Sequence, residues 1–275
     1  MLRDRMVVAI LLLPVGLWLV ASGGLPFWAL VSAFLVLGGL EYGQLFEHVG
    51  LHPSPWVLAL GILAVTAVRA WAGFNHAGIL LLLIILGALL YYLVRFERGG
   101  SRSASEFAVS LGGILYLGWV GAYLVSLRAL VDGTWWFLIV MPAIWLADSL
   151  AFSIGRRYGR HPMTPRLSPR KTWEGYLGSV LGGALGGGGL ALLWQMAARP
   201  GSGVGPLAGL LIGGLVGVLA PLGDLAISMI KREVGVKDSG NLLPGHGGAL
   251  DRIDSWIVAA AVGYYLVLGL APMFR

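Results

Sequence analysis

Four aspartates stand out because each lies inside or at the edge of a long apolar run. Asp148 and Asp224 lie in two such runs, and Asp251 and Asp254 open a third. Because Asp251 and Asp254 are three residues apart, a helix places both on one face. A carboxylate in or near hydrocarbon is costly, and its default interpretation is functional. Oxygen donors from three runs, in a chain without cysteine, predict a site for a hard cation such as Mg²⁺.

The same acids also have a structural interpretation, in which each one only neutralises a nearby base. The bases in question are Arg156, Lys231 and Arg252. We favour a site because acids from separate helices arrive at a similar depth on one side. Glu41, toward the end of another apolar run, is interpreted as a structural hydrogen-bonding group.

Two polar segments carry the groups that a phosphate ligand needs. Residues 168–175 combine two cations and two hydroxyls with a predicted helix start, and helix N-termini beside cations suit phosphate oxygens. Residues 228–254 add further bases and a glycine turn around His246, which we interpret as a site residue because two aspartates and an arginine follow it closely. The basic cluster Arg156, Arg157 and Arg160 is interpreted as contact with anionic lipid.

The elements that position these residues must lie in lipid. Of the 275 residues, 57% are hydrophobic and 12% charged, against about 25% charged in an average soluble domain. A membrane helix needs about 20 apolar residues, and the sequence therefore predicts an all-α polytopic membrane protein with about nine spans. The spans are 6–21, 26–46, 56–71, 77–94, 107–127, 134–154, 173–198, 206–230 and 253–271.

The distribution of positive charge predicts the orientation of these spans. With alternating sides, 15 of the 19 lysines and arginines fall on the side of the N-terminus and 4 on the other, so the N-terminus is predicted to be cytoplasmic. We divide the chain into residues 1–130, with about five spans, and residues 131–275, with about four. The predicted cytoplasmic loops 155–172 and 231–252 of the second part would carry the chemistry.

One long segment resembles a known family. Residues 228–255 read SxxKRxxGVKDxGxxLPGHGGxLDRxDS, which is similar to the signature of the phosphatidate cytidylyltransferases (CDP-diacylglycerol synthases). Residues 223–225, 168–175 and 148–149 also match, so the resemblance covers about 147–255, and the N-terminal half matches only as a multi-span region. Arg170 stands where the family has lysine, and Leu150 where it has a small residue.

The resemblance implies transfer of CMP from CTP to phosphatidate, with CDP-diacylglycerol and pyrophosphate as products. It implies Mg²⁺, with K⁺ as a candidate second cation, and a homodimer in the bacterial inner membrane whose active site faces the cytoplasm. No nucleic acid is expected as a partner. The residues expected to act in catalysis are Asp224, Asp251, Lys231 and His246. The expected substrate contacts are Ser168, Arg170, Lys171, Thr172, Arg232, Lys237, Asp238 and Arg252. The expected metal ligands are Asp224, Asp251, Asp148 and Asp254.

Three other functions compete with this interpretation. A CTP-dependent lipid kinase of the dolichol or phytol kinase kind would also join a nucleotide to a lipid site, and the product distinguishes the two. A CDP-alcohol phosphatidyltransferase would need a longer motif than Asp132-Gly133 offers. A secondary transporter would place its acids near the bilayer midplane between repeats, whereas these acids lie toward one face and no repeat is apparent.

Overall fold

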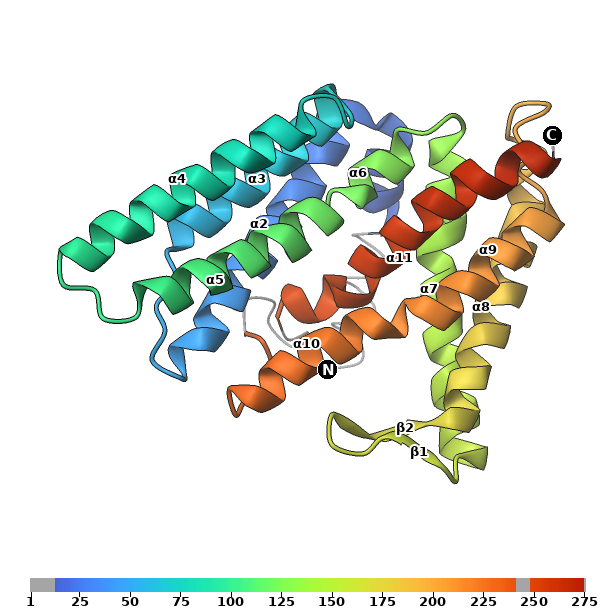
Figure 1. Cartoon of the computed structure of the whole chain (residues 1–275). Helices are drawn as coiled ribbons and strands as arrows, with labels where there is room; N and C mark the ends of the chain where they lie inside the picture. The colour runs from blue at the N-terminus through green and yellow to red at the C-terminus, as the bar shows by residue number, and fades with distance from the viewer. Residues whose placement is uncertain (1–12, 241–247, 275) are drawn as a thin grey trace.

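The computed structural model of the chain describes residues 13–240 and 248–274 (Figure 1). In this part of the chain, 7 helices are long and apolar enough to cross a membrane. Two shorter apolar helices, Leu13–Ser22 and Pro55–Trp71, coincide with the first and third predicted spans, the first of which begins outside the described residues. The predicted all-α polytopic class is confirmed at this level, and the count of nine spans stays a prediction.

The order of elements follows the predicted runs closely. The helices of the N-terminal half are α2 (Gly24–Glu47), α3 (Pro55–Trp71), α4 (Ala77–Glu97), α5 (Ser103–Gly113), the π-helix η1 (Ile114–Val120) and α6 (Tyr123–Arg128). The C-terminal half contains α7 (Gly133–Tyr158), β1 (Pro162–Thr164), β2 (Ser168–Thr172), α8 (Trp173–Trp194), α9 (Pro206–Leu219), α10 (Pro221–Glu233), α11 (Leu250–Leu270) and the 3₁₀ helix η2 (Ala271–Phe274).

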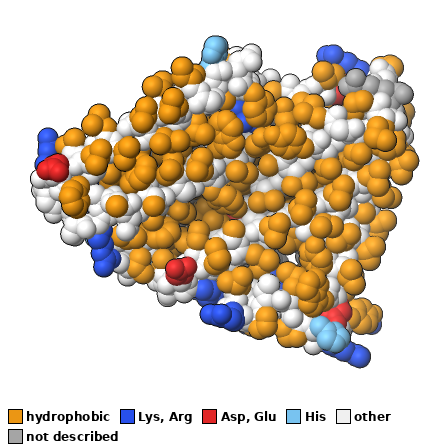
Figure 2. Space-filling view, in the orientation of Figure 1, with side chains coloured by type: hydrophobic (Ala, Val, Ile, Leu, Met, Phe, Trp, Pro, Cys, Tyr) orange, Lys and Arg blue, Asp and Glu red, His pale blue; other side chains and the backbone are white. Residues whose placement is uncertain are grey.

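Many large apolar side chains of the helices are exposed, as expected for helices surrounded by lipid. Large apolar residues such as Trp56, Leu90 and Leu185 are 74%, 64% and 67% exposed. Hydrophobic side chains are spread over the whole face in Figure 2, and most of the charged side chains lie near its edges. This surface is inverted relative to that of a soluble protein and matches a bilayer environment.

Polar contacts tie the helix connections together at two separate ends. At one end, Arg95 and Arg102 donate to the carbonyls of His52 and Val49, at 2.8 and 2.7 Å, joining the α2–α3 and α4–α5 connections. At the other end, Arg128 donates to the carbonyl of Val20 at 2.6 Å. The helices of the N-terminal half therefore run alternately up and down.

The eighth predicted span is broken into two helices. Proline lacks a backbone N–H and interrupts a helix unless it stands in the first turn. Helix α9 ends at Leu219, and Pro221 opens α10 after the single residue Ala220. Asp224 therefore lies in the first turn of a new helix.

Helices α8 and α9 meet along a seam of glycines. A methyl group on Gly183 would overlap the carbonyl oxygen of Gly213, and one on Gly187 would overlap that of Gly209. The two backbones are thus in direct contact, the close approach that small residues permit in membranes. We call Gly183, Gly187, Gly209 and Gly213 the glycine seam.

Candidate functional site

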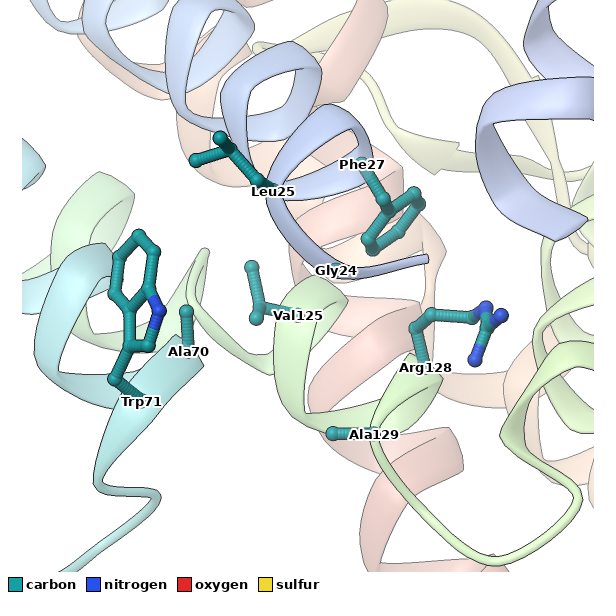
Figure 3. Close-up of a pocket in the computed structure, with 8 residues that line it drawn as sticks. All are labelled: Gly24, Leu25, Phe27, Ala70, Trp71, Val125, Arg128 and Ala129. Atoms are coloured by element: carbon teal, nitrogen blue, oxygen red, sulfur yellow. The ribbon is translucent and has the colours of Figure 1, made fainter. Parts of the chain in front are cut away.

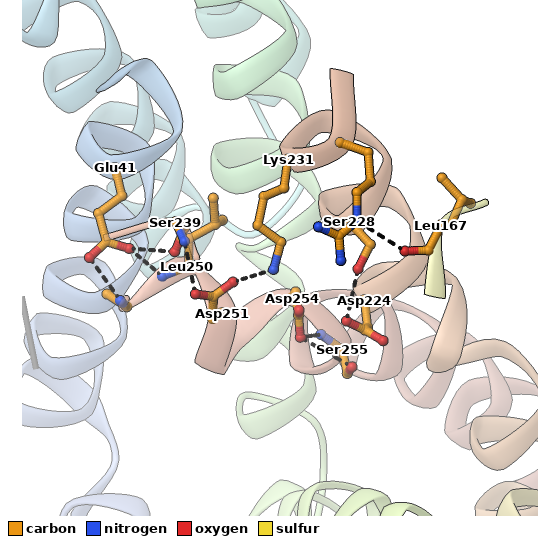
Figure 4. Close-up of polar contacts among 12 residues, drawn as sticks. Glu41, Leu167, Asp224, Ser228, Lys231, Ser239, Leu250, Asp251, Asp254 and Ser255 are labelled. Atoms are coloured by element: carbon orange, nitrogen blue, oxygen red, sulfur yellow. Dashed lines mark hydrogen bonds and ion pairs between the residues drawn. The ribbon is translucent and has the colours of Figure 1, made fainter. Parts of the chain in front are cut away.

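The site is built where α10 crosses the start of α11. Gly223 of α10 lies so close to α11 that a methyl group on it would overlap the carbonyl oxygen of Asp254. This contact brings together the first turn of α10, with Asp224, and the first turns of α11, with Asp251 and Asp254 (Figure 4). Three of the four predicted metal ligands therefore come from one helix crossing.

Lys171 forms an ion pair with Asp224. The lysine is contributed by β2, immediately before α8, and its partner by α10. Ser228, one turn further along α10, is placed to donate to the other carboxylate oxygen of Asp224 at 3.4 Å. Both members of the ion pair are about one third exposed, at 31% and 33%, so the pair is open to an incoming polar ligand.

A second ion pair joins α10 to α11. Lys231 Nζ lies 2.6 Å from Asp251 Oδ1, with side-chain exposures of 12% and 18%. The backbone N–H of Ser239 donates to Asp251 Oδ2 at 3.0 Å. Both oxygens of Asp251 are therefore engaged, and removing either charge would leave its partner half-buried and unpaired.

The two remaining acids lie around these pairs. Asp254 is 7% exposed and accepts from the N–H of Ser255 at 2.5 Å and from its hydroxyl at 3.2 Å. Asp148, exposed on α7, interacts electrostatically with Lys171 and Asp224. All four predicted acids thus belong to one neighbourhood, in which Lys171 pairs with Asp224 and Lys231 pairs with Asp251.

The donor set has the chemistry that Mg²⁺ prefers, since carboxylate oxygens are its usual protein ligands. Within residues 13–240 and 248–274, however, no three acidic or histidine side chains stand close enough together to hold a metal ion. Two of the acids are instead compensated by lysine ammonium groups. The four-aspartate ligand set therefore stays a prediction.

A β-hairpin borders the site. The sequence predicts residues 155–172 only as a loop, whereas β1 and β2 pair there as antiparallel strands and lead directly into α8. Thr172 accepts from the N–H of Gly175 at 3.2 Å and so caps α8, which confirms the predicted helix start. Arg232 of α10 donates to the carbonyl of Leu167 at 3.3 Å. The hairpin is therefore tethered to the helix that carries Asp224.

Comparison with known proteins decides the family. The sequence pattern of the Cytidylyltransferase family matches residues 3–270. This chain belongs to that family. A Synechocystis sp. protein named phosphatidate cytidylyltransferase is 30% identical over 305 residues, covering 99% of this chain and 98% of its own. A Brucella abortus protein of the same name is 32% identical over 276 residues, covering 96% and 92%. One from Mycobacterium bovis is 35% identical over 211 residues, covering 75% and 66%.

The other residues predicted to contact substrate in this cytidylyltransferase lie on the elements around the α10–α11 crossing. Ser168 and Arg170 lie on β2, with Arg170 exposed. Lys237 and Asp238 are exposed beyond the end of α10, and Arg252 is exposed in the first turn of α11. His246 lies outside the described residues.

Two groups that sequence reasoning missed hold this cytidylyltransferase site together. Glu174 closes the base of the hairpin, because its carboxylate lies 2.6 Å from His161 Nδ1 and accepts from the N–H of Arg160 at 3.1 Å. Ser239 orients Asp251 through a backbone N–H. Glu174 lies within the 168–175 segment, so the sequence does offer a signal for it. The backbone N–H of Ser239 leaves no signal in the sequence, because every residue except proline has one.

A cavity of about 120 Å³ opens elsewhere, at the far ends of the helices (Figure 3). It is lined by Gly24, Leu25, Phe27, Ala70, Trp71, Val125, Arg128 and Ala129. It touches none of the predicted site residues, and Gly24 stands at the opposite end of α2 from Glu41. The cavity is therefore separate from the cytidylyltransferase site.

Proposed function

We propose that this protein transfers CMP from CTP to phosphatidate, giving CDP-diacylglycerol and pyrophosphate. The observation that carries the proposal is the pair of neighbouring Lys–Asp contacts at the α10–α11 crossing, Lys171–Asp224 and Lys231–Asp251. Such an arrangement offers cations to polyphosphate oxygens and acids to a divalent cation within one small volume. The names of the relatives in three bacterial genera support the same substrates.

The reaction makes modest demands on the protein. The phosphate of phosphatidate is a monoester whose second pKa is about 6, so a nucleophilic oxygen is present at neutral pH and no strong base is needed. That oxygen bonds to the α-phosphorus of CTP while the bond from this phosphorus to the bridging oxygen breaks, and pyrophosphate leaves. The site must align two polyanions and neutralise the charge that develops on the leaving group.

The bases of the site suit this task. We assign phosphate contacts to Lys171, Lys231 and Lys237, assisted by Arg232 and Arg252. His246 is assigned to the nucleotide or the pyrophosphate. The remaining polar residues of the two loops, Ser168, Arg170, Thr172 and Asp238, complete the assigned substrate contacts.

Mg²⁺ is the cation that the carboxylate oxygens of the site suit best. We assign Asp224 and Asp251 as its ligands, with Asp148 and Asp254 as further ligands or hydrogen-bonding supports. When bound, the ion would supply positive charge to the phosphate oxygens. A second cation, such as K⁺, is part of the same proposal.

We further propose nine spans, a cytoplasmic N-terminus and a homodimer in the inner membrane. The active site would then face the cytoplasm, where CTP is made. The charge asymmetry of 15 to 4 among the 19 basic residues supports this orientation.

Labelling of single cysteines tests the orientation, because the chain has no cysteine of its own. Ser101 lies exposed in the α4–α5 connection and Asn75 in the α3–α4 connection, at opposite ends of α4. In intact cells with a permeable outer membrane, a membrane-impermeant maleimide should label Asn75→Cys at once and Ser101→Cys only after lysis. The reverse pattern would invert the proposed topology.

An assay with purified protein tests the reaction itself. Protein in detergent is given radiolabelled CTP, phosphatidate and Mg²⁺, and label is followed into the lipid phase together with released pyrophosphate. We expect lipid-borne cytidine and pyrophosphate in equal amounts, both abolished by EDTA. Transfer of the γ-phosphate alone would assign the protein to the lipid kinases, and no transfer to any lipid acceptor would reopen the transporter interpretation.

A further inference from the structure

A fully buried acid of the N-terminal half reaches into the site. Glu41 of α2 is 0% exposed. It accepts from the hydroxyl of Ser239 at 3.1 Å and from the backbone N–H groups of Ala249 and Leu250 at 3.0 and 2.8 Å. The sequence interpretation of Glu41 as a hydrogen-bonding group is therefore correct, but its partners lie about 200 residues away and at the start of α11 (Figure 4).

Glu41 acts as the cap of α11. The first N–H groups of a helix have no partner within the helix, and α11 has no side-chain cap of its own at Ala249. The carboxyl group of Glu41 accepts from two N–H groups at this end, where the helix dipole also favours an acid. An acid on α2 therefore holds the first turn of α11, which carries Asp251.

A second contact links Glu41 to Asp251 through Ser239. Ser239 donates its hydroxyl to Glu41 Oε2 and its backbone N–H to Asp251 Oδ2. Asp251 in turn accepts from Lys231 through its other oxygen. An unbroken line of hydrogen bonds thus runs from Glu41 through Ser239 and Asp251 to Lys231, as the dashed lines in Figure 4 trace.

Backbone packs closely around the carboxyl group of Glu41. A methyl group on Gly240 would lie 2.7 Å from Glu41 Oε1, and one on Gly248 would overlap the hydroxyl of Ser239. The backbones of Gly240 and Gly248 come so close that no side chain would fit between them and Glu41 or Ser239. The carboxyl group is therefore closely enclosed and has little freedom to rotate. The residues that it holds are correspondingly fixed.

We propose that Glu41 is a positioning residue, which caps α11 from α2 and, through Ser239, orients the Asp251 carboxylate toward Lys231. The proposal rests on the proposed function, because Asp251 and Lys231 are assigned to the reaction there. It gives the N-terminal half of the chain a part in the active site, although that half carries none of the recognised motif.

The test compares Glu41→Gln with wild type in the cytidylyl transfer assay. The amide NH₂ would face the backbone N–H of Ala249 or that of Leu250 in place of an acceptor, so at least one of the two capping hydrogen bonds is lost, together with the negative charge at the start of α11. We expect kcat to fall about ten- to a hundredfold, the usual cost of removing a group that orients a ligand. The KM for CTP should stay close to the wild-type value, because Glu41 touches no substrate. A wild-type kcat in Glu41→Gln would overturn the proposal.

Glu106→Gln is the matched control. Glu106 is also a buried acid of the N-terminal half, 4% exposed, and it also accepts from a backbone N–H, that of His52 at 2.9 Å. It pairs with Arg95 of α4, and among the described residues no hydrogen bond joins it to α11. Equal loss of kcat in both variants would make the effect of Glu41 a general one of stability and would overturn the positioning role.

Two further measurements keep the outcome decisive. If Glu41→Gln does not fold, Ser239→Ala removes only one hydrogen bond to Glu41 and should lower kcat in the same direction, and an unchanged kcat would contradict the link. Hydrogen exchange of the Leu250–Asp254 amides should speed up in Glu41→Gln and not in Glu106→Gln. This readout needs no substrate, so an inactive wild type would refute the proposed function, whereas unchanged exchange would refute the capping.

Discussion

Asp224→Asn and Asp251→Asn should each lower kcat for cytidylyl transfer by at least about a hundredfold, the scale of losing one preorganised electrostatic group. Asparagine keeps the size of the side chain but removes the charge, so neither the ion pairs with Lys171 and Lys231 nor the proposed Mg²⁺ contact survives. Initial rates at saturating CTP and phosphatidate, measured across a Mg²⁺ series, test this.

Asp132→Asn provides the control for these two variants. Asp132 precedes α7 at the far end of the molecule, with a φ of 55°, a conformation that asparagine also tolerates. Its rate should equal that of wild type, and all three variants should be recovered folded from the membrane. Near-normal activity in both Asp224→Asn and Asp251→Asn would remove the basis for the metal assignment.

Gly223→Ala should disable the enzyme without touching a charged group. Its methyl group would overlap the carbonyl oxygen of Asp254, so α10 and α11 must move apart. A displacement of about 1 Å can cost a hundredfold in rate, and overpacking of this kind costs about 1–3 kcal/mol of stability. We expect a loss of activity on that scale and a lower melting temperature in detergent.

Gly214→Ala separates this effect from a general intolerance of bulk. Gly214 lies in the same Pro206–Glu233 span, and the nearest atom to an added methyl group there, Ala184 Cβ, is 3.4 Å away, an ordinary contact. Its activity and melting temperature should match wild type. If Gly223→Ala is as active as Gly214→Ala, the close crossing of α10 and α11 is not what sets the geometry of the site.

Much of the site could be predicted because its signals are local. Hydropathy predicts the helices, since each buried or lipid-facing run must be long enough to cross hydrocarbon. Thr172 could be recognised as a helix start because a cap acts on a residue three positions away. Asp251 and Asp254 could be placed on one helix face because residues three positions apart on a helix are neighbours.

The pairing of charges could not be predicted, because it depends on how distant helices pack. Lys231 was a candidate partner for Asp224 on the same helix, yet it reaches Asp251, and Asp224 is paired with Lys171 from the hairpin. The partners of Glu41 lie even further along the chain. Pro221 did carry a visible signal for the break in the eighth span, which the continuous hydropathy of residues 206–230 concealed.

The glycine seam determines how far Lys171 lies from Asp224 along the axes of α8 and α9. Lys171 directly precedes α8, and Asp224 follows α9 across a short break, so the vertical offset between the two helices is also the offset between the two charges. If α8 slid along α9 by four residues, from one glycine of the seam to the next, the two charges would move about 6 Å apart. Since glycine is already the smallest residue, every substitution in the seam can only widen it. A change in the register of α8 against α9 would therefore separate Lys171 from Asp224 and disrupt the site.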